Sequence, residues 1–548
     1  MKNYLIYYLL ITLSIIVNSC SEGFKEEYSK YSLVLKEVTA ITTPTTDTTP
    51  DYTFSSTESG AITYGGSCSS STTSATSGKN TITLNTLSVG PYADCTITVS
   101  ITVTTNKSVT NLSDSLTITP FTVSSSDDSS SDASSSANPI VAGRYHSCAI
   151  LGNASVKCWG RSNLGNLGIG TTDDRGDEAG EMAALSSINL GTGRTATSIS
   201  GSNVHTCALL DNASVKCWGY GLNGRLGQGN TSNLGGGANE MGDNLPSIDL
   251  GTGRTATAIA AGGNHSCAIL DNASVKCWGK NIFGQLGLDY TPDNLGHQPG
   301  EMGDNLSSIN LGTGRTATAI AAGSSHSCAI LDNASVKCWG YNAYGLLGID
   351  NNTTQMGDNP GEMAQLTGIN LGPGRTATAI AAGYRHSCAL LDDASVKCWG
   401  YNAYGQLGID NTADMGDGSG EMAALPSVNL GTGRTATAIA TGWYHSCALL
   451  DNASVKCWGY NTKGQLGIDS AATMGNAPGD MAGLTTVILG TGRTATAIAA
   501  GERHTCALLD NASVKCWGKN GYGQLGIDNT TDMGKTSGSM ADLTGIDL

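Results

Sequence analysis

Phenylalanine and long apolar segments are scarce in this sequence. The chain of 548 residues has only 4 phenylalanines, and aromatic residues make up 6% of it. Beyond the first twenty residues, no run is long and apolar enough to cross a bilayer as a helix. Positive charge is also limited, since 29 Lys and Arg face 45 Asp and Glu and the net charge is −16. This balance argues against affinity for nucleic acid or for anionic lipid surfaces.

A repeated unit of about sixty residues occupies most of the chain and occurs seven times between Asn138 and Leu548. Each copy holds a variant of His-Ser-Cys-Ala-Leu-Leu-Asp-Asn-Ala-Ser-Val-Lys-Cys-Trp-Gly. A fixed period of this size indicates supersecondary units that stack or form a ring, not an enzyme built around one unique site. The 73 glycines suit many short strands joined by tight turns.

The first twenty residues are typical of an export signal. Lys2 supplies the positive region, and residues 4–17 form an apolar stretch that is too short for a membrane span. The stretch ends at Val17-Asn18-Ser19-Cys20, which resembles a bacterial lipobox. The resemblance implies that residues 1–19 are a lipoprotein signal peptide and that the Cys20 thiol is acylated. The alternative is an ordinary signal peptide with a chance cysteine.

Export to a bacterial cell envelope follows from this signal. We expect an outer-membrane or cell-surface lipoprotein whose lipid is its only membrane anchor. Residues 20–40 are predicted to be a lipidated tether.

The cysteine count supports export. Of 17 cysteines, 16 remain when Cys20 is set aside, and they form eight local pairs. Regular even pairing in an exported chain predicts disulfides, and buried free thiols are the alternative. The predicted pairs are Cys68 with Cys95, Cys148 with Cys158, Cys207 with Cys217, Cys267 with Cys277, Cys328 with Cys338, Cys388 with Cys398, Cys447 with Cys457, and Cys506 with Cys516.

Residues 41–123 differ from the repeats. Polar and β-branched residues alternate there, as in Thr81-Ile82-Thr83-Leu84, and turn residues separate the runs, which predicts a small antiparallel sandwich. Thr49 to Phe54, Gly66-Ser67-Cys68 and Asp94 to Val99 together resemble bacterial immunoglobulin-like repeat domains of surface proteins. The resemblance implies a spacer role and a bridge between Cys68 and Cys95.

A linker follows this segment. Residues 124–137 are almost entirely Ser, Asp and Ala and cannot bury apolar area, so a flexible connection to the repeats at 138–548 is expected.

One repeat predicts four short strands. In the copy from Ala256 to Leu311 they are Ala256–Gly262, His265–Leu270, Ser274–Gly279 and Ser308–Leu311. This is the layout of a propeller blade. The first strand has small residues, which suits an innermost position where strands crowd around an axis.

The repeats resemble the regulator of chromosome condensation repeat family. The residues that carry the resemblance are Gly383-Tyr384-Arg385-His386-Ser387-Cys388-Ala389-Leu390 and Val396-Lys397-Cys398-Trp399-Gly400-Tyr401-Asn402-Ala403-Tyr404-Gly405-Gln406-Leu407-Gly408. The resemblance implies an all-β fold, a seven-bladed β-propeller preceded by the immunoglobulin-like β-sandwich. The first copy begins at its innermost strand (138–143) and the last ends at its outermost (543–548).

Two features depart from the family pattern. The central hairpin turn has Ala where the family has Gly, as at Ala213, so the turn type stays open, because a left-handed backbone strains Ala. The cysteines are the second departure. If the family's hairpin register holds, Cys207 lies directly opposite Cys217, close to disulfide distance.

Catalysis and metal binding find little support in the pattern. The recurrent histidine, as at His386, precedes a cysteine by two residues, but a bridged pair has no thiolate for zinc, so a structural hydrogen bond is expected. The acidic loops, such as Asp410 to Asp414 and Gly420-Glu421-Met422, do not match a calcium loop, and solvated acids are expected, although calcium stays open. No triad stands out. We predict no enzyme activity and no cofactor or metal.

One face of the predicted propeller varies between copies. The loops between the first and second strands and after the third strand differ in sequence, whereas the opposite face repeats nearly unchanged. Tyr, Trp and Arg, the residues most enriched at binding hot spots, gather there. The candidate binding residues are Arg144, Tyr145, Phe283, Tyr344, Tyr384, Arg385, Tyr404, Trp443, Tyr444, Arg503 and Tyr522. The alternative is drift in tolerant loops.

These observations predict a non-enzymatic binding protein held at the cell envelope, which recognises an unidentified protein or glycan. Fold analogy offers a sharper variant, because one bacterial β-lactamase inhibitor has a similar propeller. Two alternatives from other classes are nucleotide exchange on a small GTPase, the activity of the family's founding member, and hydrolysis in the propeller channel. Export and disulfides argue against the first, and the absence of a unique acid cluster argues against the second.

Overall fold

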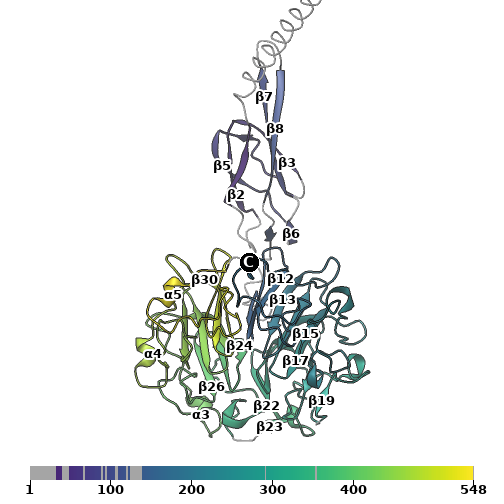
Figure 1. Cartoon of the computed structure of the whole chain (residues 1–548), viewed down its shortest axis with the longest axis vertical. Coiled ribbons are helices and arrows are strands. Elements are labelled where there is room, and N and C mark those ends of the chain that lie inside the picture. Colours follow the sequence, from purple (N-terminus) through teal and green to yellow (C-terminus); the bar gives the residue numbers. More distant parts are fainter. Residues whose placement is uncertain are drawn as a thin grey trace, which may run out of the picture. The chain divides into compact units, whose positions relative to one another are not determined.

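The computed structural model describes residues 33–39, 49–65, 68–87, 90–92, 95–104, 109–118, 121–123, 139–290, 292–351, 355–546 and 548 (Figure 1). The chain divides into two compact units, Met1–Ser131 and Asp132–Leu548. The predicted signal peptide, Cys20 and the linker at 124–137 lie outside the described residues. Within the described residues, no helix has the length and apolarity needed to span a bilayer.

The first unit contains two main antiparallel sheets and a separate strand pair. One sheet has the order β1 (Leu35–Thr39), β2 (Asp51–Ser56), β5 (Gly78–Thr83). The other has the order β4 (Ser74–Ala75), β3 (Gly60–Gly65), β7 (Thr96–Thr104), β8 (Val109–Thr117), and β6 (Gly90–Tyr92) pairs with β9 (Phe121–Val123).

Both sheets of the first unit share one core. Along β7 every second residue is buried, so Ile97 and Val99 face inward against Tyr52 and Phe54 of the other sheet. Cys68 and Cys95 are joined, with their Cα atoms 5.2 Å apart. The segment predicted to be a tether enters this unit, because β1 pairs with β2.

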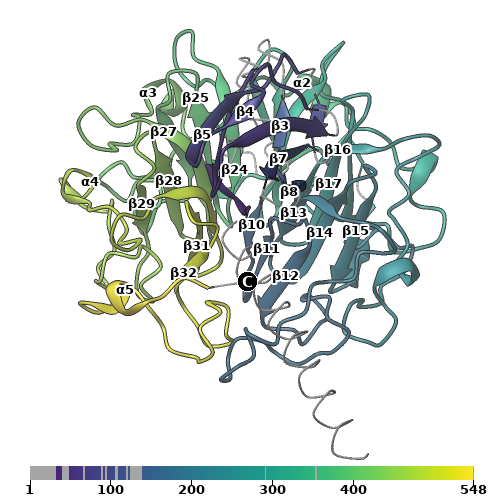
Figure 2. The same ribbon diagram turned by 90° about the horizontal axis from the view of Figure 1, so that it is seen from above.

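In the second unit, the described residues form seven antiparallel sheets, one for each copy of the repeat (Figure 2). We number the sheets in chain order. The first three strands of the sheets are β10 (Ile140–Ala142), β11 (His146–Ile150), β12 (Val156–Gly160); β13 (Ala196–Gly201), β14 (His205–Leu210), β15 (Val215–Gly219); β16 (Ala256–Ala261), β17 (His265–Leu270), β18 (Val275–Lys280); β20 (Ala317–Ala322), β21 (His326–Leu331), β22 (Val336–Tyr341); β24 (Ala377–Ala382), β25 (His386–Leu391), β26 (Val396–Gly400); β27 (Ala436–Thr441), β28 (His445–Leu450), β29 (Val455–Gly459); and β30 (Ala495–Ala500), β31 (His504–Leu509), β32 (Val514–Gly518).

Short helical turns follow the third strands. They are η2 (Leu222–Gly224), η3 (Gly242–Asn244), η4 (Gly303–Asn305), η5 (Ala343–Gly345), α2 (Glu362–Gln365), α3 (Glu421–Ala424), α4 (Asp480–Gly483) and α5 (Ser539–Asp542).

The fourth strand differs from the prediction. In the third sheet β19 (Asn294–Leu295) pairs with the end of β18, and in the fourth sheet β23 (Gln355–Met356) does the same with β22. The predicted strand Ser308–Leu311 makes one backbone bond, from Ile309 N–H to Val275 O at 2.9 Å, and is not a strand. Ile309 and Leu311 are buried and the residue between them is exposed. This alternation arises because the segment packs across the edge of the sheet.

The small-residue strands are innermost, as the composition predicted. β16 pairs only with β17, and it lies against the corresponding strands β13 and β20 of the two adjacent sheets. The last inner strand, β30, in turn contacts β10, so the sheets close into a ring.

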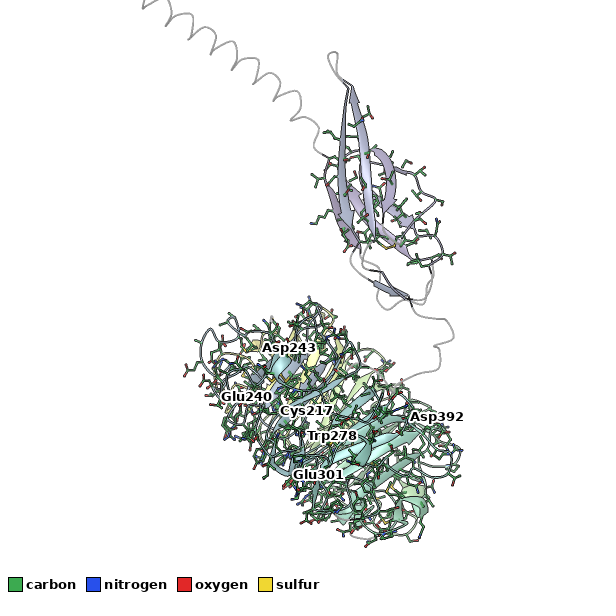
Figure 3. The ribbon with its side chains drawn as sticks, turned by 90° about the vertical axis from the view of Figure 1, so that its right-hand side faces the viewer. Cys217, Glu240, Asp243, Trp278, Glu301 and Asp392 are labelled. Carbon is green, nitrogen blue, oxygen red and sulfur yellow. A yellow bond between two sulfur atoms is a disulfide. The ribbon has the colours of Figure 1, made fainter. Side chains whose placement is uncertain are left out.

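Each tryptophan of the repeat fills the space between two sheets. Trp278 of the third sheet packs in one cluster with Cys207, Cys217 and Leu226 of the second sheet. Figure 3 labels Cys217 and Trp278 in this unit. The disulfide of one sheet is therefore part of the apolar surface that receives the tryptophan of the next.

The hairpin register places the two cysteines of each repeat opposite one another. Cys207 pairs with Cys217 across β14 and β15, with their Cα atoms 4.1 Å apart, and the bridge forms in all seven copies. This spacing is typical of a pair without hydrogen bonds between the facing residues. The turn is left-handed at Ala213, with φ of 60°, so Ala takes a conformation that suits Gly better.

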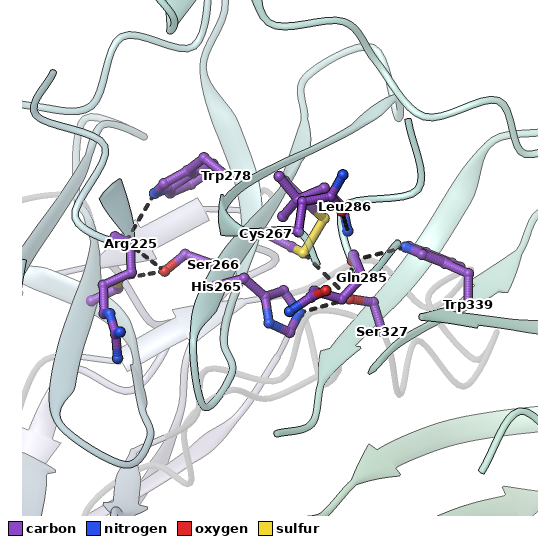
Figure 4. The surroundings of a disulfide bond; sticks show 12 residues. Arg225, His265, Ser266, Cys267, Trp278, Gln285, Leu286, Ser327 and Trp339 are labelled. Carbon is purple, nitrogen blue, oxygen red and sulfur yellow. Dashed lines mark hydrogen bonds between the residues drawn. A yellow bond between two sulfur atoms is a disulfide. The ribbon is translucent and has the colours of Figure 1, made fainter. Parts of the chain in front are cut away.

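A hydroxyl group links each sheet to the one before it (Figure 4). The Ser327 hydroxyl donates to Gln285 O at 2.9 Å and lies 2.8 Å from His265 Nε2. Trp339 Nε1 donates to the same carbonyl at 3.1 Å. Because the hydroxyl proton goes to the carbonyl, His265 Nε2 must carry a proton and donate it to Ser327.

The same contacts close the ring. Ser147 of the first sheet lies 3.0 Å from His504 Nε2 of the seventh and donates to Gln524 O at 2.9 Å. Trp159 Nε1 also donates to Gln524 O, at 3.1 Å. The recurrent histidine is thus a structural group between sheets.

Carboxylates of the acidic loops are bound to backbone amides. Asp410 of the fifth sheet accepts the Met481 N–H of the sixth at 2.8 Å, and Asp528 of the seventh accepts the Met182 N–H of the first at 2.9 Å. Glu421 accepts three backbone N–H groups within its own loop. The expectation of simply solvated acids is wrong for these residues, because their oxygens satisfy amides that have no other partner in the turn.

We predict that acid destabilises the propeller before ordinary carboxylates titrate. Burial lowers the pKa of His265 to about 3 and that of His326 to about 4, from 6.5. Such groups stabilise the fold above pH 6.5, and this contribution is lost as the pH falls toward the folded-state pKa. Denaturant unfolding near pH 7.5 and near pH 5.5 should show a loss of roughly 1 kcal/mol for each buried histidine.

Two variants check the origin of this loss. His386→Gln removes one buried imidazole. The chain should therefore bind one proton fewer when it unfolds in the pH range between 7.5 and 5.5. His297→Gln is the control, because His297 is only partly buried, lies 3.0 Å from Glu301 and is not one of the histidines between the sheets. Equal unfolding free energies at the two pH values would contradict the prediction.

Candidate binding face

The variable loops place aromatic side chains from neighbouring sheets against one another. Tyr384 lies between β24 and β25, and Trp443 and Tyr444 lie between β27 and β28. The rings of Tyr384 and Trp443 stack with centroids 4.5 Å apart. Tyr444 lies edge-on to Tyr384 at 5.7 Å. Both arrangements are favoured by the ring quadrupoles.

Residues that follow the third strands extend this group. Tyr404 lies 5.2 Å from Tyr444 and 4.8 Å from Tyr460, and Tyr401 lies 4.8 Å from Tyr344 of the preceding sheet. All of these rings are half-buried, so each has one part packed and another open to a partner.

Trp443 reaches across the mouth of the central channel. Its indole N–H donates to Asn203 Oδ1 of the second sheet at 3.1 Å. The Arg144 guanidinium lies 4.7 Å from its ring centroid. A depression lies at this mouth of the channel and is lined by glycines and alanines at the ends of the seven inner strands. Tyr384, Trp443 and Glu502 form part of its wall. The tryptophan therefore connects the second and sixth sheets.

Glu502 is the carboxylate that organises the cations near the axis. It is 5% exposed and pairs with Arg144 at 3.0 Å and with Arg503 at 3.4 Å. Its backbone N–H also donates to Gly143 O at 3.1 Å. The seventh and first sheets thus meet through an ion pair as well as through the ring contacts.

A second aromatic group lies at this junction. Tyr145 and Tyr522 have centroids 5.0 Å apart. Arg161 lies 4.6 Å from the Tyr522 centroid, and Lys519 lies 4.8 Å from that of Tyr145. Burial raises the pKa of Tyr145, with Glu502 adding to the shift, so this phenol is neutral at pH 7.

These groups form one continuous band that runs from the fourth sheet through the fifth, sixth and seventh to the first. The two aromatic groups are joined because Arg144 contacts Trp443 and Arg503 lies 5.6 Å from the Tyr460 centroid. We call it the aromatic–basic band. Its members are Tyr344, Tyr384, Arg385, Tyr401, Tyr404, Trp443, Tyr444, Tyr460, Glu502, Arg503, Arg144, Tyr145, Arg161, Lys519 and Tyr522.

Ten of the eleven predicted binding residues lie in this band. Phe283 does not, because its ring packs on Tyr341, 4.7 Å away, between the third and fourth sheets. Sequence reasoning missed Glu502, Tyr401, Tyr460, Arg161 and Lys519. The last four share one repeat position, directly after Trp-Gly, which is aromatic or cationic in every copy. The third strand predicted from the sequence ends at the preceding glycine, as at Gly279, and the next position was not included among the variable loop residues.

The band has the chemistry of a contact surface. Its rings and cations bind by stacking and by charge, and burial raises the pKa of Tyr444 above its ordinary value. Within the described residues, no set of three or more His, Cys, Asp or Glu side chains is arranged to hold a metal ion.

We predict that Trp443 alone accounts for fluorescence quenching by soluble ions. The seven repeat tryptophans are at most 1% exposed, whereas Trp443 is half-buried at the channel mouth. Iodide should quench more than caesium, because the Arg144 guanidinium lies against this indole. Trp443→Phe should abolish the quenchable fraction, and Trp278→Phe should leave it unchanged. Quenching that persists in Trp443→Phe would contradict this assignment.

Comparisons with known proteins agree with the fold. A model described as "RCC1-like domain" matches residues 252–547, and one described as "Regulator of chromosome condensation (RCC1) repeat" matches residues 140–166. The chain is 30% identical over 395 residues to the ultraviolet-B receptor UVR8 of Arabidopsis thaliana, which covers 72% of this chain and 79% of that protein.

Two further similarities show how widely the fold is used. The chain is 26% identical over 369 residues to the human E3 ubiquitin-protein ligase HERC2, which covers 67% of this chain and only 7% of that protein. The crystal structure of Prp20p from Saccharomyces cerevisiae superposes with a TM-score of 0.54 at 18% identity, over 78% of this chain and 90% of that one. The repeats, the ring of sheets and these matches together show that this chain belongs to the family of proteins with an RCC1-like domain.

Proposed function

We propose that this chain is an exported, lipid-anchored and non-enzymatic binding protein that recognises a protein partner through the aromatic–basic band. The single observation that carries the proposal is the half-buried stack of Tyr384 and Trp443 at the centre of a face rich in Tyr and Arg. These residue types dominate binding hot spots, and they contribute most where a surrounding rim excludes water.

The packing of Trp443 favours a protein over a glycan. A sugar ring needs a free aromatic face on which to stack, and Trp443 already contacts both Tyr384 and Arg144. What remains open is a rim of tilted tyrosine rings, such as Tyr404 and Tyr460. Rims of this kind suit the irregular surface of a folded protein.

Export is the second part of the proposal. It is supported by the lipobox-like Val17-Asn18-Ser19-Cys20 and by an even set of cysteines that pair locally. The two-sheet first unit, with its bridge between Cys68 and Cys95, would act as an immunoglobulin-like spacer between the lipid and the propeller.

Protease shaving of intact cells of the source organism tests the location. Under non-reducing conditions, we expect propeller peptides to be released, with Cys207 linked to Cys217. Full protection of these peptides, with free thiols, would contradict export. It would instead favour an intracellular protein such as a nucleotide exchange factor.

Site-directed crosslinking tests the binding face. A photoreactive amino acid at Tyr404 should trap a defined protein from the envelope fraction, because this half-buried ring lies on the band. The same group at Thr252, which is exposed in the loop between the second and third sheets, is the matched control and should trap nothing reproducible. Adducts at both positions, or adducts to glycan alone, would count against the proposal.

A further inference from the structure

Arg161 and Lys519 are cations without an ion-pair partner in the part of the chain that the structure describes. Each lies on tyrosine rings of the same small group, Arg161 at 4.6 Å from Tyr522 and at 5.4 Å from Tyr145, and Lys519 at 4.8 Å from Tyr145. A cation on an aromatic ring keeps its outer N–H groups free to donate to a carboxylate.

The nearest carboxylates are already engaged. Glu502 pairs with Arg144 and Arg503, and Asp532 pairs with Lys463 at 3.0 Å and with Lys535 at 3.1 Å. Burial lowers the pKa of Lys519, with Arg503 and Lys463 adding to the shift and Glu502 and Asp532 opposing it. An additional carboxylate would stabilise the charged form of this ammonium group.

Several cations elsewhere in the repeats have structural partners. Lys216 donates to the carbonyls of Leu190 and Gly242 at 2.9 and 2.8 Å, and Arg194 pairs with Asp211 at 3.1 Å. The same pairing recurs in the five repeats that follow, as between Arg254 and Asp271. In a chain with a net charge of −16, the band therefore holds two cations without an ion pair side by side on one small group of tyrosine rings.

We propose that the partner is an acidic protein segment, whose carboxylates bind Arg161 and Lys519 while its apolar side chains pack on the Tyr384 and Trp443 stack. This inference rests on the proposed function and specifies the chemistry of its partner. The band offers five cations, Arg144, Arg161, Arg385, Arg503 and Lys519, against one carboxylate, Glu502. Complementary charge would speed encounter and exclude basic or neutral competitors.

The test measures binding of a poly-L-glutamate peptide to the full chain at low ionic strength. The double variant Arg161→Gln/Lys519→Gln should weaken binding by about tenfold or more. The control double variant Arg254→Gln/Arg315→Gln changes the net charge equally on the opposite face and should alter binding by less than about twofold. The charge-conserving Arg161→Lys/Lys519→Arg should retain binding, which separates loss of charge from loss of folding.

Three outcomes would overturn the inference. Equal weakening by both double variants would mean that net charge alone matters. Binding of heparin without binding of poly-L-glutamate would identify a sulfated glycan. Failure of poly-L-glutamate to bind would exclude an acidic segment.

The crosslinking experiment separates this inference from the proposed function. If Tyr404 still traps a protein after the Arg161→Gln/Lys519→Gln change, the face binds a protein but the acidic partner is wrong. If nothing is trapped from Tyr404 even in the unchanged protein, both fail.

Discussion

The hydrogen bonds between one sheet's hydroxyl and the preceding sheet's histidine and carbonyl hold the propeller together. Each hydroxyl gives its proton to a carbonyl and accepts one from an imidazole, as Ser327 does between Gln285 and His265. In six of the seven sheets the buried Nδ1 of this imidazole has no hydrogen-bond partner among the described residues, so a second proton there would be unsatisfied and the imidazole stays neutral; His205 Nδ1 instead lies 3.1 Å from the Ser202 hydroxyl. Because the same set joins His504 to Ser147, every sheet depends on both neighbours.

The seven sheets repeat nearly the same residues, so the variation between copies is confined to the loops of one face. The disulfides, the buried tryptophans and the capping carboxylates take up the invariant positions, and each is satisfied within or between adjacent sheets. What differs between copies is therefore free to specialise. Tyr, Trp and Arg accumulate from the fourth sheet to the first, so a fold with near-sevenfold symmetry presents an asymmetric surface.

The repeat made much of the local fold predictable. The second strand, His265–Leu270, was predicted at its observed bounds, because apolar residues lie between a glycine-rich loop and a turn. The prediction of the fourth strand was wrong. Ile309 and Leu311 are buried on either side of an exposed residue, as in a strand, but their segment lies across a sheet edge. Periodicity alone does not separate these cases, because both bury every second side chain. Likewise, nothing in Leu35–Thr39 indicated that this segment would pair with β2.

The sequence by itself determined the repeat length, the class of fold and the spacing that sets each pair of cysteines opposite one another, because these follow from local patterns copied seven times. Only the tertiary structure decided which variable residues meet. Trp443 bonds to Asn203 across the axis, and Arg144 pairs with Glu502 where the first and last copies join. Such contacts arise from closure of the ring, and no spacing within a single repeat encodes them.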